Sequence, residues 1–153
     1  MTDILSTSFI LVQLISVLNV LFAGIWLGQV LMDIRDHAGA WRLYSLITVL
    51  SILITQSMNY LFRRYCPWHA HPTFPSGHMM FAMSFATSLT IRECRWLWLL
   101  TPLLLLLGTA IVVVKMHEPI DVIGSIFITP PLTWLLHWIV RDPTLKHHNS
   151  API

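Results

Sequence analysis

The sequence predicts an all-α integral membrane protein, a helical bundle of about five transmembrane helices. Of its 153 residues, 56% are hydrophobic and only 10% are charged, and the mean hydropathy is +0.70. A soluble domain carries about 25% charged residues, so this chain has too few of them to cover a surface that faces water. Apolar stretches of about 20 residues, the length that a bilayer core requires, recur along the whole sequence.

We expect the spans at about 7–32, 43–62, 78–91, 96–114 and 120–140. The first stretch has neither a basic segment before it nor an Ala-x-Ala cleavage site, so we interpret it as a true span rather than a signal peptide. The third is short because Arg92 follows closely, and Thr73-Phe74-Pro75 can extend it. We recognise no soluble appendage, repeat or low-complexity linker, so residues 1–153 are predicted to form one membrane-embedded domain.

The basic residues predict how the chain is oriented. With the N-terminus outside, the outer segments carry only Arg63, Arg64 and Lys115. The inner segments carry twice as many basic residues: Arg35, Arg42, Arg92, Arg95, Arg141 and Lys146. This bias follows the positive-inside rule and supports that orientation. We expect the protein in a bacterial-type inner membrane or plasma membrane, with its active site facing outside. The same topology places Cys66 outside and Cys94 inside, so they cannot form a disulfide within one chain.

The tetrapeptide Pro75-Ser76-Gly77-His78 opens the third span. The first turn of a helix leaves backbone N–H groups unpaired, and such groups bind anions. Gly77 lets a phosphate approach the backbone, the Ser76 hydroxyl can donate to it, and His78 follows within reach. Ser and Gly are also ordinary residues at helix starts, so this turn alone is equally consistent with a structural cap.

A second cluster, His117-Glu118-Pro119-Ile120-Asp121, opens the last span. His117 and Asp121 are four residues apart, so on a helix they share one face. An Asp that accepts a hydrogen bond from one imidazole nitrogen fixes the tautomer and makes the other nitrogen a better nucleophile or base. Such a pair is also common as a structural hydrogen bond. Ionisable residues at the mouth of a membrane span nevertheless indicate function, and the two clusters together indicate phosphoryl chemistry.

These residues resemble the motifs of the type-2 phosphatidic acid phosphatase superfamily, integral membrane enzymes that remove phosphate from lipids. That family has three motifs in order: Lys, six residues, Arg-Pro; then Pro-Ser-Gly-His; then Ser-Arg, five residues, His, three residues, Asp. The second is intact at 75–78, and the end of the third matches His117 and Asp121. The first is recognisable in altered form as Arg64, six residues, then His71-Pro72. The resemblance covers about residues 55–125.

The resemblance implies a metal-independent hydrolase with a covalent mechanism. His117 would attack phosphorus and form a phosphohistidine, and Asp121 would orient it. His78 would protonate the leaving oxygen and then activate water. The groups that would hold the phosphate oxygens are Arg64, Ser76 and the amides of Gly77 and His78. No metal or other cofactor is expected, because in that family cationic groups and N–H donors stabilise the developing charge.

The departures from the motifs concern the basic residues. His71 stands where the first motif has Arg, and a neutral imidazole holds phosphate less firmly than a guanidinium. Ala110 and Ile111 stand where the third motif has Ser-Arg. His71 and Lys115 are therefore candidate substrate-binding residues, with Lys115 or Arg63 as replacements for the missing Arg. A changed phosphate substrate, a dependence on acidic pH through His71, and a weakened activity all remain open.

The predicted position of the site, at the outer boundary of the membrane, favours an amphiphilic substrate that lies in the bilayer. Lipid phosphates and polyprenyl diphosphates fit this description. The expected partners are this substrate and the bilayer, with no nucleic acid, and the sequence leaves the oligomeric state open.

Two alternatives stand beside the phosphatase. One is a relative that binds or transports a lipid phosphate without cleaving it, which the missing Arg at position 111 favours. The other is a membrane haem or metal protein, suggested by the eight histidines. Against it, no Cys or carboxylate completes a ligand set beside His69 and His71. His137, inside the last span, is interpreted as a satisfied interior or interface residue.

Overall fold

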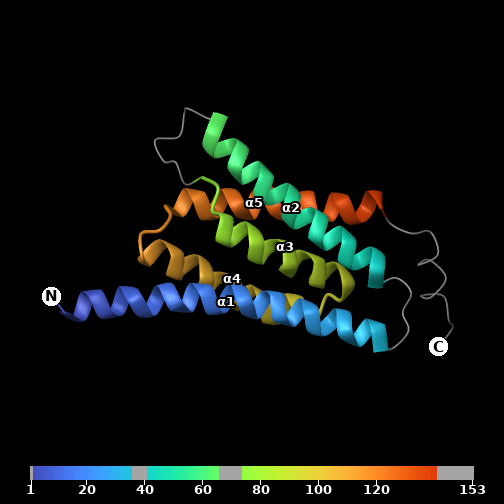
Figure 1. The fold of residues 1–153 in the computed structure, drawn as a ribbon, viewed down its shortest axis with the longest axis horizontal. Helices are drawn as coiled ribbons and strands as arrows, with labels where there is room; N and C mark the ends of the chain where they lie inside the picture. The colour runs from blue at the N-terminus through green and yellow to red at the C-terminus, as the bar shows by residue number, and fades with distance from the viewer. Residues whose placement is uncertain (1, 36–40, 66–73, 141–153) are drawn as a thin grey trace.

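A computed structural model describes residues 2–35, 41–65 and 74–140, and it is a bundle of helices (Figure 1). In chain order these are α1 (Thr2–Arg35), α2 (Trp41–Tyr65), α3 (Gly77–Arg92), α4 (Trp96–Val113) and α5 (Pro119–Ile139). The described residues contain no strand, so the all-α prediction is confirmed. Four helices, α1, α2, α4 and α5, are long and apolar enough to cross a membrane, as expected for an integral membrane bundle.

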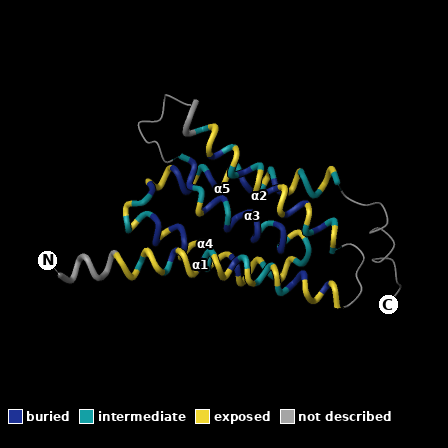
Figure 2. The backbone as a smooth tube through the Cα atoms, in the orientation of Figure 1, coloured by how far each residue is buried: buried dark blue, intermediate teal, exposed yellow. Residues whose placement is uncertain are grey.

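The third helix is short and lies in the middle of the bundle (Figures 1 and 2). Its 16 residues rise about 24 Å, less than the roughly 30 Å of a bilayer core. It packs against each of the other four helices, and nine of its residues are buried. Phe74 and Pro75 precede it as non-helical backbone, so these two residues do not lengthen the helix itself, and Thr73 lies outside the described residues. Protein rather than lipid covers most of α3, which is why it need not match the bilayer thickness.

The apolar core surrounds α3, and the outer faces of the bundle are apolar too. Phe22 of α1, Leu89 of α3 and Leu107 of α4 are fully buried in this core. Figure 2 shows that exposed positions follow the outer sides of the long helices. Large apolar side chains more than 60% exposed include Phe9, Val20, Trp98, Leu105 and Phe127. A continuous apolar surface of this kind suits a bilayer and would promote aggregation in water.

Buried hydroxyl groups join α2, α3 and α5. The hydroxyl seam consists of Ser51, Thr55, Ser84, Ser125, Thr129 and Thr133, all fully buried. The hydroxyl oxygens of Ser51 and Thr133 are 2.6 Å apart, and those of Thr55 and Ser84 are 3.4 Å apart. Small hydroxyl residues let membrane helices approach closely and form hydrogen bonds between them. The seam therefore holds α2 close to the central pair of α3 and α5.

The bundle has two different ends. The site end comprises the starts of α3 and α5 and the end of α4, and the opposite end comprises the end of α3 and its neighbours. At the opposite end, Arg92 on α3 pairs with Asp33 on α1, with 3.0 Å between Nη2 and Oδ1. Gln29 Nε2 donates to the same carboxylate oxygen at 3.1 Å. His137 Nε2 lies 3.1 Å from Ser88 Oγ, so His137 is a satisfied interior residue, as expected.

Candidate active site

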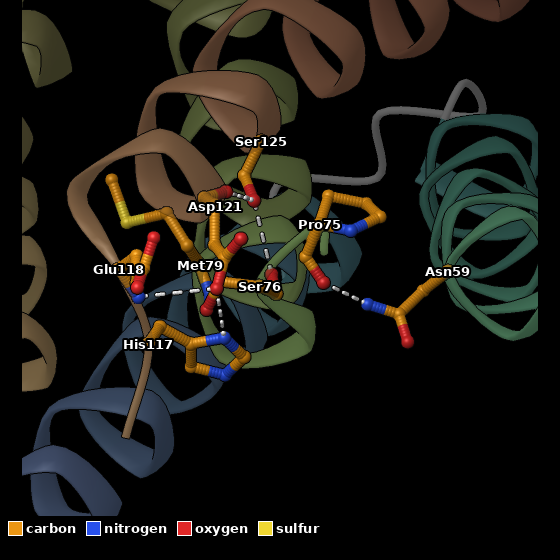
Figure 3. Close-up of polar contacts among 8 residues, drawn as sticks. All are labelled: Asn59, Pro75, Ser76, Met79, His117, Glu118, Asp121 and Ser125. Atoms are coloured by element: carbon orange, nitrogen blue, oxygen red, sulfur yellow. Dashed lines mark hydrogen bonds and ion pairs between the residues drawn. The ribbon is translucent and has the colours of Figure 1, made fainter. Parts of the chain in front are cut away.

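His117 and Asp121 form a buried pair at the site end. Nδ1 of His117 lies 3.2 Å from Oδ2 of Asp121, and Asp121 is fully buried. The backbone N–H of Glu118 donates to the same carboxylate oxygen at 3.1 Å (Figure 3). A carboxylate only accepts, so in the neutral ring of His117 this contact places the proton on Nδ1 and leaves the lone pair on Nε2. That is the tautomer that a nucleophile or base requires.

The spacing of His117 and Asp121 predicted that both lie on one face of a helix, and this is not what the structure shows. Helix α5 begins at Pro119, so His117 belongs to the turn before the helix and Asp121 to its first turn. Pro119 fixes the backbone at the first helical position, where its missing N–H leaves no helical bond unmade. The contact therefore depends on the shape of the turn between α4 and α5, and that shape is what brings the imidazole over the helix start.

His78 brings a second imidazole to the same place. It is the second residue of α3 and is exposed. The ring centroids of His78 and His117 are 6.3 Å apart, with the edge of one ring toward the face of the other. The site end thus presents one buried imidazole, oriented by a carboxylate, beside one exposed imidazole. This arrangement can supply a nucleophile and a general acid or base to one reacting group.

The Pro-Ser-Gly-His turn caps the start of α3. Ser76 is the N-cap residue, and its Oγ accepts from the N–H of Met79 at 3.4 Å. The residue is fully buried, so the capping interpretation of this turn holds, and a role of the hydroxyl toward phosphate stays a prediction. A Cβ added to Gly77 would lie 3.4 Å from Gln56 Oε1, an ordinary contact. Packing alone therefore does not explain a glycine at this position.

The two helix starts are tied together by backbone and hydroxyl contacts. The N–H of Ser76 donates to the carbonyl of Asp121 at 3.2 Å. The hydroxyl of Ser125, one turn beyond Asp121 in α5, lies 2.8 Å from that carbonyl and 3.2 Å from the carbonyl of Ser76. Figure 3 shows these contacts crossing between the first turns of α3 and α5. The second and third motifs, 39 positions apart from His78 to His117, are thereby held in a fixed relation.

Two amide side chains of α2 also hold the turn, and neither is among the residues predicted from the sequence. Asn59 Nδ2 donates to the carbonyl of Pro75. Gln56 Nε2 donates to the carbonyl of Gly77 at 3.1 Å. Both amides stand near the end of a predicted membrane span, where a polar side chain needs a partner. Their spacing of three residues, which places them on one side of α2, was the signal available in the sequence.

Phe74 and Gly124 set the approach of the chain to the turn. A Cβ on Gly124 would lie 2.3 Å from Cε2 of Phe74, so the ring occupies the space that only a glycine leaves. The ring of Phe62 on α2 packs edge-on against Phe74, with 5.9 Å between centroids. Phe74 therefore fastens the segment before Pro75 to both α2 and α5.

The structure describes only some of the positions where cationic groups were expected. Arg64 lies in the last turn of α2, but its side chain and all of His71 lie outside the described residues. Ile111, at the position of the missing Arg, is fully buried in the apolar core. Lys115 is exposed in the turn before His117. No cation from position 111 can therefore reach the site, and a replacement must come from a neighbouring segment.

Lys115 has an unusual backbone. Its φ is 59°, in the left-handed region that favours glycine. Its N–H bonds the carbonyl of Val112 at 3.0 Å, and the N–H of Met116 bonds that of Ile111 at 3.2 Å. These are the two bonds of a Schellman cap at the end of α4, and the left-handed position of that cap is usually a glycine. The cap turns the chain sharply from α4 toward His117.

Metal-binding side chains do not gather in the described part of the chain. No group of three or more His, Cys, Asp and Glu residues is close enough there to hold a metal ion. His78 and His117 come near each other, but Asp121 already engages Nδ1 of His117. The geometry of these residues gives the metal-protein alternative no support.

Comparison with known proteins assigns the family. The family model of the PAP2 superfamily matches residues 40–144, more than half of the chain. The match takes in α2 to α5 and every predicted site residue, and α1 lies outside it. Comparisons with curated proteins and with solved structures gave no match. Because the matched region contains the intact Pro-Ser-Gly-His turn and the His117–Asp121 pair, sequence motif and geometry agree, and the chain belongs to the PAP2 superfamily of phosphatase-like membrane proteins.

Proposed function

We propose that this protein is an integral membrane phosphatase that hydrolyses a lipid phosphate or a polyprenyl diphosphate through a phosphohistidine intermediate. The observation that carries the proposal is the buried His117–Asp121 pair beside the exposed His78. The orientation of the first imidazole by a carboxylate leaves a nitrogen lone pair for attack, and the second imidazole lies near enough to serve the leaving group.

In the first step, Nε2 of His117 attacks phosphorus and a P–N bond forms. The P–O bond to the leaving group breaks, and the imidazolium of His78 gives its proton to the departing oxygen. Asp121 stabilises the positive charge that develops on the His117 ring. In the second step, His78 takes a proton from water, the resulting hydroxide attacks phosphorus, and the P–N bond breaks. Inorganic phosphate is released and His117 is restored.

The charge on the phosphate oxygens would be held at the start of α3. The N–H groups of Gly77 and His78 belong to the first turn, whose N–H groups have no acceptor within the helix. Donors that are fixed before the reaction stabilise developing charge without reorganising. Arg64, His71 and Lys115 are proposed as the accompanying cationic or polar groups, and Ser76 as a further donor.

The proposed substrate lies in the bilayer. The site end adjoins helices whose outer faces are apolar, so an amphiphile can bring its phosphate to the site while its hydrocarbon chain stays in lipid. The excess of basic residues on the other side of the predicted topology supports a site that faces outside the cell.

The test is phosphate release by purified protein across a panel of lipid monophosphates and polyprenyl diphosphates. We expect release from at least one substrate by the wild type and none above background by His117→Ala. Absence of release over the whole panel, at acidic as well as neutral pH, would refute the enzymatic function.

The second candidate is a relative that binds lipid phosphate without cleaving it. The burial of Ile111 favours it, because the family's Arg at this position has been replaced by a core residue. For this candidate, lipid phosphate protects the protein against thermal unfolding although no phosphate is released. The same panel, read once by phosphate release and once by melting temperature, separates the two functions.

A further inference from the structure

Three consecutive carbonyl groups of the Pro-Ser-Gly-His turn accept hydrogen bonds from side chains of other helices. The carbonyl of Pro75 accepts from Asn59, and that of Gly77 accepts from Gln56 at 3.1 Å, both on α2. The carbonyl between them, of Ser76, lies 3.2 Å from the Ser125 hydroxyl on α5, which shares its one proton between this carbonyl and that of Asp121 at 2.8 Å. Figure 3 shows the Asn59 and Ser125 contacts reaching the turn from different directions.

Two of these carbonyls belong to the peptide groups that matter for phosphate. The carbonyl of Ser76 and the N–H of Gly77 form one peptide group, and the carbonyl of Gly77 and the N–H of His78 form the next. A hydrogen bond to a carbonyl polarises its peptide group and makes the N–H at the other end a stronger donor. It also fixes the plane of the peptide, and thereby the direction of that N–H.

We propose that Gln56 and Ser125 are positioning residues for phosphate binding, acting through the peptide groups of Gly77 and His78. This rests on the proposed function, because it takes those two N–H groups as the phosphate donors. Asn59 fixes the preceding carbonyl and so the direction in which the chain reaches the turn. The motif residues alone therefore do not make the binding site, because side chains of α2 and α5 fix its backbone.

The hydroxyl seam provides a matched control. Ser51 and Thr133 join the same two helices, α2 and α5, through a 2.6 Å contact between their hydroxyl groups. Thr133 is eight residues beyond Ser125 along α5, about 12 Å away by helical rise, and its hydroxyl contacts that of Ser51. Thr133→Val removes one buried hydrogen bond between the helices and leaves the three carbonyl contacts in place.

The experiment measures how orthovanadate and inorganic phosphate bind purified protein, by inhibition of phosphate release and by protection against thermal unfolding. We expect Gln56→Met and Ser125→Ala each to raise the inhibition constant of orthovanadate about tenfold. Ser125→Thr keeps a hydroxyl and should restore that constant to within about threefold of wild type. Thr133→Val should lower the melting temperature while its inhibition constant stays within about twofold of wild type.

The proposal is overturned if Gln56→Met and Ser125→Ala bind orthovanadate as tightly as wild type, or if Thr133→Val weakens binding as much as they do. Failure of the proposed function looks different. In that case the wild type releases no phosphate, and protection against thermal unfolding by orthovanadate still measures binding at the turn. Weaker protection of Gln56→Met and Ser125→Ala would then support the positioning role without catalysis.

Discussion

The site end and the opposite end of the bundle each bury a carboxylate, with different partners. Asp121 contacts an imidazole and a backbone N–H within one turn of chain, and an exposed imidazole stands beside the pair. Asp33 contacts the guanidinium of Arg92 and the amide of Gln29. The contact of Asp33 with Arg92 joins α1 and α3. Because a guanidinium stays protonated and offers no lone pair, Asp33 can exchange no proton with this partner. The chemistry of a buried carboxylate is thus decided by its partner rather than by its burial.

The largest contrast is expected between the two histidines of the site end. His117→Ala removes the nucleophile and should lower phosphate release at least about 10³-fold for every substrate. His78→Ala removes the acid and base and should lower it by about 10²–10⁴-fold, least for substrates with a good leaving group. Rapid-quench measurements with such a substrate should detect phosphoenzyme in His78→Ala and none in His117→Ala. Phosphoenzyme in His117→Ala would place the nucleophile elsewhere.

The second contrast compares the two carboxylates by the same substitution. In Asp121→Asn the side-chain amide can donate to Nδ1 of His117, which moves the ring proton to Nε2 and blocks attack, so release should fall by about 10²–10⁴-fold. In Asp33→Asn the salt bridge is lost, and the free energy of unfolding should fall by about 1–3 kcal/mol at nearly unchanged turnover. Phosphate release and thermal unfolding in detergent check both variants. The comparison breaks if Asp33→Asn loses turnover as Asp121→Asn does.

A smaller contrast concerns two glycines. Gly124→Ala forces the ring of Phe74 away, because the new Cβ would lie 2.3 Å from its Cε2, and should destabilise the fold by about 1–3 kcal/mol. Phosphate release should fall as well, since Phe74 leads directly into the turn. Gly28→Ala on α1, where nothing lies within 4 Å of the new Cβ, should change stability by no more than about 1 kcal/mol, in the stabilising direction. Equal melting temperatures for the two variants would contradict the packing described for Phe74.

The smallest expected effect is at Lys115. Lys115→Gly relieves the left-handed backbone and should stabilise the protein by about 1 kcal/mol. If the ammonium attracts the phosphate, the same variant should raise KM by up to about fivefold, the range of an exposed charge pair. Lys115→Arg keeps the charge and should keep KM. A more stable Lys115→Gly with unchanged KM would remove Lys115 from the substrate-binding residues.

Much of the fold could be predicted from the sequence, because a bilayer imposes length and apolarity on each span. The predicted boundaries of α2, α4 and α5 are within about three residues of the structure. The central place of α3 could not be predicted, since hydropathy measures how apolar a segment is and not which neighbours cover it. Its buried Ser84 and Ser88 gave a hint, as hydroxyl groups in a span pack against protein rather than lipid.

The candidate site divides in the same way. His78, His117 and the turn at 75–78 could be predicted as candidates because their chemistry can be recognised in short stretches of sequence, and the structure brings them together. Gln56 and Ser125 were not predicted, because their contacts with the turn join residues 21 and 49 positions apart along the chain, which only helix packing brings together. Arg64 and His71 keep the status of predictions, since the side chain of the first and all of the second lie outside the described residues.

The hydrogen bond from the N–H of Ser76 to the carbonyl of Asp121 has an electrostatic consequence. It holds the starts of α3 and α5 together, and each helix start carries roughly half a positive charge from its aligned peptide dipoles. A group at the site end therefore meets a positive field from two helices at once. This field belongs to the backbone, so it neither titrates nor disappears when a side chain changes. At a site where Ile111 stands in place of the motif's arginine, the two helix starts therefore supply positive potential. Mutation of a single side chain leaves this potential in place.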